Sequence, residues 1–275
     1  MGVRVDEVSA GTSREFLSYV YKDARFRISR EGYDAATLAI RTGRKALERY
    51  ILSNPAFRDS LVPVQIIPGP ETGAGSGIDS SLSACDAVPP LALAMHRASL
   101  ATGVGPMAAV AGTFAELAGQ AALAAGARES IVENGGDIFM KLESPLVMGL
   151  YAGTSALSGK LAFRIDPGIT PLGACSSSGT MGHSLSLGKC DLATVFAADT
   201  ALADAAATLA ANLVRTEADI QSALDRVGSI PGILGVLIIK GDKLGMTGGL
   251  PPLVKHHDPR FEYKVTRDPR SGWVF

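Results

Sequence analysis

The hydrophobic pattern of this chain changes once, near Ser130, and that change limits the folds open to it. Before Ser130 the segment Met107–Ala125 is rich in alanine and has helical spacing, and it ends at Gly126. After Ser130, short apolar runs such as Ile138–Met140 alternate with Gly, Pro and Ser turns, which is typical of antiparallel strands. We therefore predict an α+β fold in which layered mixed or antiparallel sheets pack against Ala-rich helices.

The hydrophobic pattern and the turn residues also predict the individual helices and strands and a single domain. No linker separates independent halves, so residues 1–275 are expected to form a single domain: N-terminal strands and helices (1–100), a central segment (101–248) and a polar tail (249–275). The N-terminal part is expected to contain strands at Ala24–Ile28, Ala36–Ile40 and Val62–Ile67, a helix at Gly43–Leu52 and a Gly-rich loop at Gly69–Cys85. Beyond it we expect helices at Leu91–Leu100, Thr200–Val214 and Glu217–Val227, strands at Leu146–Leu150, Lys160–Ile165, Gly173–Ser177, Asp191–Ala197 and Phe261–Val265, and a hairpin of Gly235–Lys240 with Lys243–Met246.

Composition excludes several classes of function. The 26 basic and 27 acidic residues leave a net charge of −1, so nothing favours binding to nucleic acid. The N-terminus has no apolar signal segment, and no apolar run is long enough to span a membrane, so we expect a cytoplasmic protein. Three cysteines without a CxxC spacing argue against a zinc site and against a disulfide framework.

The first candidate site is the segment Glu133–Asp137, with the sequence Glu-Asn-Gly-Gly-Asp. Gly135 and Gly136 permit positive φ and allow a ligand to approach the backbone, while Asn134 and Asp137 place an amide and a carboxylate at either end. The alternative is an ordinary hairpin turn, because Asn-Gly and Gly-Asp pairs are common turn residues.

The second candidate is the segment Cys175–Gly179, with the sequence Cys-Ser-Ser-Ser-Gly, followed by His183. The hydroxyls of Ser177 and Ser178 and the N–H of Gly179 could donate hydrogen bonds to a phosphate or a polyol. A serine nucleophile with His183 as its base is a further hypothesis, although the spacing does not fix their orientation. The alternative is a polar turn.

The third candidate lies on the expected helix Thr200–Val214. Asp204, Thr208 and Asn212 are spaced by four, so they form one stripe. A carboxylate and a hydroxyl on one face suit Mg²⁺, which prefers a few protein oxygens together with phosphate and water. The alternative is a solvated stripe opposite an apolar face of Leu202, Leu209 and Leu213.

The order of these motifs resembles that of a known family. Gly112 begins a helix that leads to Gly-Gly-Asp at residues 135–137, then to Ser-Ser-Gly at residues 177–179, then to Ala-Asp-Ala-Ala-Ala-Thr at residues 203–208. This order resembles ApbE, the flavin transferases that move FMN from FAD onto a protein threonine. With the segment Gly103–Gly112 included, the chain resembles most the leaderless ApbE-like uncharacterised protein family 0280.

The resemblance implies sites for a flavin nucleotide and a metal. It implies that Asp204 and Thr208 hold Mg²⁺, with a backbone carbonyl of Ala109 or Val110. It also implies that FAD or FMN lies against the two glycine-containing segments, residues 134–137 and 177–179.

Besides the expected absence of an export leader, two departures separate the chain from the transferases. Ala111 stands where they carry a lysine, and the segment Gly182–Gly188 lacks their Asp-Pro. Phosphate cleavage therefore lacks recognisable electrostatic support, and whether the chain is an enzyme stays open at this point. Any catalysis would be Mg²⁺-assisted transfer or hydrolysis at a phosphate, with His183 as the base to test.

Three functions remain open. The first is binding of a flavin nucleotide or a similar phosphorylated small molecule, with Mg²⁺. The second is an enzyme that acts on a different small metabolite without flavin. The third is a non-enzymatic member of the fold that holds a ligand or forms a homo-oligomer through its Ala-rich helices.

Overall fold

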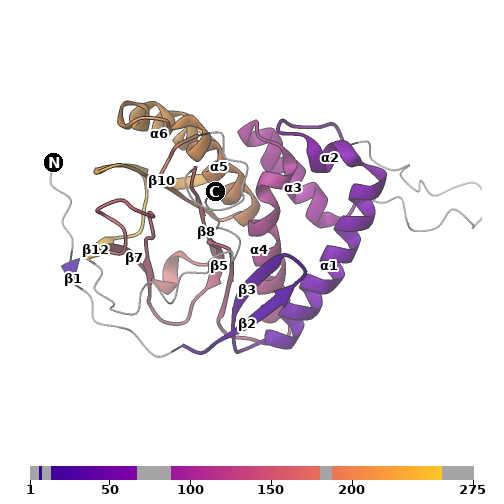
Figure 1. Ribbon diagram of the computed structural model, residues 1–275. Coiled ribbons are helices and arrows are strands. Elements are labelled where there is room, and N and C mark those ends of the chain that lie inside the picture. Colours follow the sequence, from indigo (N-terminus) through magenta and orange to yellow (C-terminus); the bar gives the residue numbers. More distant parts are fainter. Residues whose placement is uncertain (1–5, 8–13, 67–87, 180–187, 256–275) are drawn as a thin grey trace, which may run out of the picture.

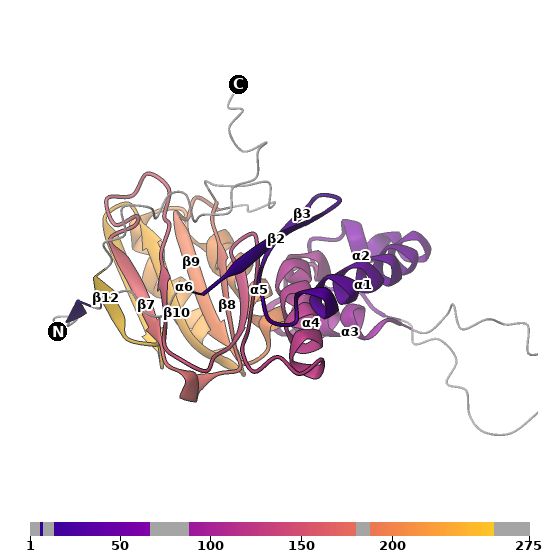
Figure 2. The same ribbon diagram turned by 90° about the horizontal axis from the view of Figure 1, so that it is seen from below.

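A computed structural model describes residues 6–7, 14–66, 88–179 and 188–255, and it confirms the α+β class. The helices between residues 33 and 124 lie together on one side, whereas the helix at residues 220–228 lies over strands on the other side (Figures 1 and 2). The helices are α1 (Tyr33–Ser53), α2 (Pro55–Asp59), α3 (Pro90–Thr102), α4 (Val110–Ala124), α5 (Thr200–Leu213) and α6 (Ile220–Gly228). Short 3₁₀ turns, Pro106–Ala109, Pro167–Ile169 and Glu217–Asp219, connect some of them.

The strands form two sheets. The larger sheet has the order β11-β10-β9-β8-β5-β4-β3-β2, and each neighbouring pair is antiparallel. The smaller sheet has the order β1-β12-β7-β6 and is mixed, because β1 and β12 are parallel. The strands are β1 (Asp6–Glu7), β2 (Phe16–Tyr21), β3 (Ala24–Ser29), β4 (Ser130–Asn134), β5 (Asp137–Lys141), β6 (Leu146–Gly149), β7 (Leu161–Ile165), β8 (Leu172–Ser177), β9 (Leu192–Ala197), β10 (Ile233–Lys240), β11 (Lys243–Gly248) and β12 (Leu253–Lys255).

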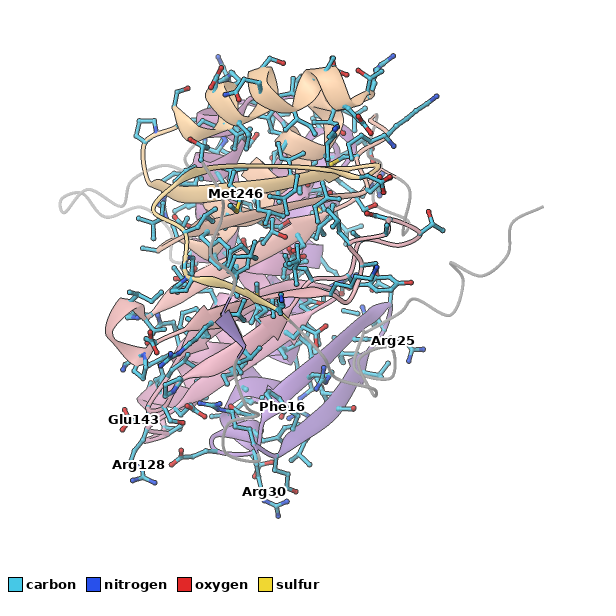
Figure 3. The ribbon with its side chains drawn as sticks, turned by 90° about the vertical axis from the view of Figure 1, so that its left-hand side faces the viewer. Phe16, Arg25, Arg30, Arg128, Glu143 and Met246 are labelled. Carbon is cyan, nitrogen blue, oxygen red and sulfur yellow. The ribbon has the colours of Figure 1, made fainter. Side chains whose placement is uncertain are left out.

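The core has three layers: helices, the large sheet and the small sheet. One face of the large sheet packs against the helices, and the other packs against the small sheet, where Phe163 of β7 meets Phe196 of β9 edge to face with ring centroids 4.9 Å apart. Alternation along β3 follows this layering: Phe26 and Ile28 are buried against helices, whereas Arg25 points outward (Figure 3).

Alanines let α5 lie close to the sheet. Ala203, Ala206, Ala207 and Ala210 are completely buried in contact with the residues of β8, β9 and β10. In the described part of the chain, one helical stretch, Pro106–Ala124, is long and apolar enough to cross a membrane by length and composition, and 44% of that apolar window is buried in the fold.

Two expected strands are wrong. Ala36–Ile40 belongs to α1, which begins at Tyr33 and buries Ala36, Ile40, Gly43 and Leu47 at helical spacing. A five-residue window is too short to reveal that period. Residues 62–66 of the expected strand Val62–Ile67 are irregular, and Pro63 lacks the N–H that a sheet ladder needs. Residue 67, the loop Gly69–Cys85 and the strand Phe261–Val265 lie outside the described residues.

The expected meander is also interrupted. After β5 the chain leaves the large sheet, forms the β6–β7 hairpin in the small sheet, and returns at β8 to pair with β5. The remaining expected helices and strands that fall on described residues are confirmed with bounds that differ by a few residues, except that the helix expected at Gly43–Leu52 belongs to α1 and begins ten residues earlier, at Tyr33. The helix expected at Met107–Ala125 is α4 preceded by a 3₁₀ turn.

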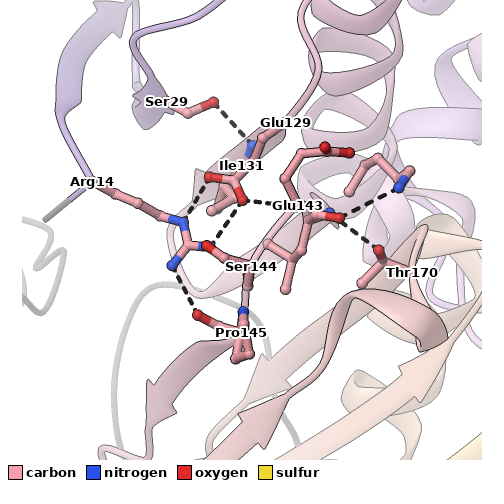
Figure 4. A network of polar contacts seen from close by, with 10 residues as sticks. Arg14, Ser29, Glu129, Ile131, Glu143, Ser144, Pro145 and Thr170 are labelled. Atoms are coloured by element: carbon pink, nitrogen blue, oxygen red, sulfur yellow. Dashed lines mark hydrogen bonds and ion pairs between the residues drawn. The ribbon is translucent and has the colours of Figure 1, made fainter. Parts of the chain in front are cut away.

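A polar network fastens the N-terminal segment to the sheet (Figure 4). Arg14 binds both carboxylate oxygens of Glu129, at 2.6 and 2.9 Å, and donates to the carbonyls of Ser144 and Pro145. Burial raises the pKa of Glu129, but the bonds from Arg14 and from the Glu143 N–H outweigh it, so that the net pKa is lowered. The charged carboxylate is thus the form that the fold stabilises.

Arg14→Ala is expected to lower the free energy of unfolding by about 2 kcal/mol at pH 7, because it leaves a half-buried carboxylate without its partner. A lowered folded-state pKa contributes stability above the unfolded pKa and loses it as the pH falls through the folded pKa. The difference between the variant and the wild type should therefore shrink in acid, as measured by urea unfolding. Arg30→Ala, which removes an exposed ion pair with Glu15, is the control and should change little.

Candidate functional site

The turn between β4 and β5 is a two-residue hairpin. Gly135 and Gly136 have φ of 66° and 108°, and Asn134 pairs with Asp137 across the turn. The alternative of a hairpin is thus correct as a description of the backbone. Its two polar ends are nevertheless buried, because Asn134 is 8% and Asp137 7% exposed, and both lie on the side of the sheet that faces the helices.

The turn contacts both α4 and β8. The Asn134 Nδ2 donates to the carbonyl of Ala111 at 3.1 Å, in the first turn of α4. A Cβ placed on Gly136 would lie 3.9 Å from the carbonyl oxygen of Ser176, and Asp137 lies beside the thiol of Cys175. The first two predicted segments therefore meet in space.

Helices α4 and α5 cap each other's N-termini. The N–H of Gly112 donates to Asp204 Oδ2 at 2.8 Å, and the N–H of Thr200 donates to Glu116 Oε2 at 2.9 Å. The arrangement is reciprocal: Glu116 stands four residues after Gly112 in α4, and Asp204 stands four residues after Thr200 in α5. Carboxylates at these positions satisfy free N–H groups and offset the positive ends of the helix dipoles. Asp199, the residue before α5, accepts from the Leu202 N–H, as expected of a cap.

Close packing at this crossing requires glycine at position 112. A Cβ there would lie 2.5 Å from the carbonyl oxygen of Thr200 and 2.8 Å from the Cβ of Asp204. The alternative that the Asp204 stripe is solvated is wrong for Asp204, which is 8% exposed, whereas Leu213 of the supposed apolar face is 40% exposed. Helix α5 is thus rotated so that its acid faces α4.

Asp137 and Asp204 form a buried acidic pair. Burial raises the pKa of Asp137 to about 7, against the smaller opposing effects of Cys175 and the Ser176 N–H. Burial and repulsion from Asp137 raise the pKa of Asp204, although the N–H groups of Gly112 and Ala111 partly offset this. Oδ1 of Asp137 is buried and has no hydrogen-bond partner among the described residues. Two such carboxylates need a shared proton or a cation.

The other predicted site residues that the structure describes lie at and after the end of β8 and on α5. Ser177 ends β8, and Ser178 Oγ and the Gly179 N–H both donate to the Cys190 carbonyl, at 3.3 and 2.8 Å. Thr208 is half-buried one turn after Asp204 on α5. His183 lies outside the described residues. Among those described, no three His, Cys, Asp or Glu side chains form a group that could hold a metal ion.

Sequence reasoning missed Glu116 and gave Cys175 no role, although Cys175 begins the second candidate segment. Glu116 caps α5, and burial raises its pKa. Cys175 is completely buried between Asp137 and α5, and its Sγ lies 3.5 Å from the carbonyl of Thr200. The sequence feature that could have identified Glu116 is its position four residues after Gly112, the first glycine of the expected helix. Nothing in the sequence distinguishes Cys175 from an ordinary core residue.

The fold is that of the ApbE-like proteins. The flavinyl transferase ApbE from Pseudomonas stutzeri, solved in its apo form, matches with a TM-score of 0.53 over 90% of this chain and 96% of that chain, at 11% identity. A family model described as "AbpE bacteria" matches residues 19–231.

Sequence relatives define the family more narrowly. A UPF0280 protein of Methanospirillum hungatei JF-1 is 43% identical over 242 residues, which is 88% of each chain. A UPF0280 protein of Methanosarcina barkeri strain Fusaro is 39% identical over 231 residues, covering 84% of this chain and 83% of the relative. The chain belongs to the UPF0280 family of ApbE-like proteins.

Proposed function

We propose that the chain binds a flavin nucleotide or a similar phosphorylated small molecule, with Mg²⁺, where the hairpin 134–137, the end of β8 and the N-terminal turns of α4 and α5 meet. The observation that carries this proposal is a buried acidic pair at the crossing of α4 and α5, in which Asp204 accepts from the Gly112 N–H at the start of α4 and Asp137 has an unpartnered oxygen among the described residues. Buried carboxylates whose pKa values are strongly raised are more common at functional sites than elsewhere.

The donor set fits Mg²⁺. Asp204 would supply a carboxylate oxygen and Thr208 a hydroxyl, with Asp137 close by, and Mg²⁺ takes few protein oxygens when phosphate and water complete its shell. The cation would also offset the negative charges of the two carboxylates and the phosphate. A phosphate beside Asp137 and Asp204 would be repelled, and a divalent ion held by these carboxylates would turn that repulsion into attraction. When bound, the ion would neutralise negative charge on the phosphate.

We infer binding rather than established transfer. Ala111 has no charge to place beside a phosphate, and its carbonyl is occupied by Asn134. Asp204 and Glu116 take up N–H groups of the first turns of α4 and α5. Transfer or hydrolysis at a phosphate would need a proton acceptor, and His183 is the residue to test for that role.

The test is thermal stability with ligands. FAD or FMN with MgCl₂ is expected to raise the melting temperature, and EDTA to abolish the rise, because only the folded state binds. Asp204→Asn keeps an oxygen to accept from Gly112 but removes the charge, so it should lose the Mg²⁺-dependent rise.

Substitutions at position 208 serve as the matched pair. Thr208→Val removes the hydroxyl and should weaken the Mg²⁺-dependent rise, whereas Thr208→Ser keeps the hydroxyl and should retain it. A melting temperature that ignores FAD, FMN and Mg²⁺ but responds to another metabolite would replace the proposal with an enzyme or binding protein of different chemistry. An unchanged rise in Asp204→Asn would refute the metal assignment.

A further inference from the structure

A cavity of about 140 Å³ lies between the β2–β3 hairpin, α1 and the start of α4. Both overall views place this hairpin beside α1 (Figures 1 and 2). The cavity shares the wall made by Asn134 and Ala111 with the candidate site, but neither Asp137 nor Asp204 lines it. It is therefore an adjoining space that shares Asn134 with the proposed site but does not include the acidic pair.

Three aromatic rings from three different elements line the cavity. They are Tyr21 of β2, Phe26 of β3 and Phe114 of α4. Phe26 and Phe114 are 2% and 4% exposed, so these rings form fixed walls, and Ile40 of α1 adds an aliphatic contact. Aromatic rings favour stacked or edge-to-face contacts with another ring.

The volume limits the size of an occupant. A cavity of about 150 Å³ lined by apolar side chains accommodates benzene. The present cavity is of that size, so it takes one six-membered ring, while a fused tricyclic ring system exceeds it. A larger molecule would have to extend beyond the cavity.

One amide supplies the polar edge. Asn134 uses one N–H of its side chain on the Ala111 carbonyl, which orients the amide and leaves its second N–H and its Oδ1 for a ligand. A ring that carries an amide, or a heteroaromatic ring with a donor and an acceptor side by side, would match this pair of groups.

The charges at the cavity are balanced by a network that ties the hairpin tip to α1. Arg44, which lines the cavity, binds Asp23 at 2.9 Å and Glu48 at 3.0 Å, and Lys22 binds Glu48 at 2.6 Å. Two cations and two carboxylates leave no net charge to attract an ion. The occupant is therefore neutral at its ring.

We propose that this cavity is a binding site for a neutral aromatic or heteroaromatic ring of a small molecule, held between Tyr21, Phe26 and Phe114 with its polar edge at Asn134. The probe is benzamide, added to protein labelled at isoleucine δ1-methyl groups. We expect benzamide to shift the NMR signal of Ile40. Cyclohexanecarboxamide has the same amide without an aromatic ring and is expected to bind more weakly.

Two variants test the position and the aromatic preference. Ala24 lines the cavity, and Ala24→Leu fills existing space, so it should leave the protein folded and weaken benzamide binding by more than about tenfold. Ala124→Leu, at the exposed end of α4, is the matched control and should bind as the wild type does. Tyr21→Leu removes one ring and should reduce the preference for benzamide over cyclohexanecarboxamide.

Three results would overturn the proposal. The first is an Ile40 signal that benzamide does not move, and the second is a benzamide shift that persists undiminished in Ala24→Leu. The third is equal binding of the two amides by the wild type. None of these readouts uses flavin or Mg²⁺, so failure here leaves the proposed function untouched, and failure of flavin binding leaves this site untouched.

Discussion

Asp137→Asn is expected to raise the free energy of unfolding by about 2 kcal/mol or more at pH 8, with little change near pH 4. The pKa of Asp137 is raised to about 7 in the fold, so the folded state binds the proton more tightly than the unfolded chain does. The stability that this provides is complete below the unfolded pKa and is lost as the pH rises through about 7. Asparagine carries no charge at any pH, so the variant does not lose this folding stability as the pH rises.

The charged and polar groups around Asp137 shift its pKa, and they therefore affect the interpretation of the pH dependence. Asp204 repels it from α5, Glu133 raises its pKa from β4, and Cys175 and the Ser176 N–H lower it from β8. Replacement by Asn also relieves Asp204, which adds to the gain at high pH. Urea unfolding in EDTA between pH 4 and pH 8 measures the difference without a bound cation.

Asp219→Asn is the control of opposite sign. Bonds from the N–H groups of Thr216 and Arg215 lower the pKa of Asp219, so its carboxylate stabilises the fold at neutral pH and loses that effect in acid. Its replacement should cost stability at pH 7 and little at low pH. If Asp137→Asn instead destabilised the protein equally at every pH, the buried acidic pair described above would be wrong.

Gly112→Ala is expected to lower the free energy of unfolding by about 3 kcal/mol. The new Cβ would lie 2.5 Å from the Thr200 carbonyl oxygen, which belongs to backbone, so one helix must move. That movement also strains the bond between the Gly112 N–H and Asp204, and with it the reciprocal caps of α4 and α5. Urea unfolding at pH 7 measures the loss.

Gly168→Ala is the matched control. Nothing lies within 4 Å of a Cβ at Gly168, so this substitution should change stability by only a few tenths of a kcal/mol. Gly112→Ala should also reduce any Mg²⁺-dependent rise in melting temperature, because it displaces Asp204. Equal stability of the two variants would show that α4 and α5 can separate without cost.

Local patterns predicted most of the described elements. The apolar alternation of β3, the Ala-rich period of α4 and the Gly241-Asp242 turn between β10 and β11 are short-range signals, and the structure confirms them. The failures at Ala36–Ile40 and Val62–Ile67 arose where a few apolar residues fit either period. There, packing of α1 against α4 and the missing N–H of Pro63 decided the outcome.

In the candidate site, too, some features follow from local sequence patterns and others from long-range contacts. The sequence by itself determined most of the helices and strands and the turn at Gly135–Gly136, because each depends on neighbours within a few residues. The order of the motifs along the chain indicated an ApbE-like protein. Only the tertiary structure decided that Asp204 faces α4, that Glu116 caps α5 and that Cys175 lies beside Asp137. Those contacts join residues far apart in the chain, and the rotation of a helix about its axis is fixed by what it packs against.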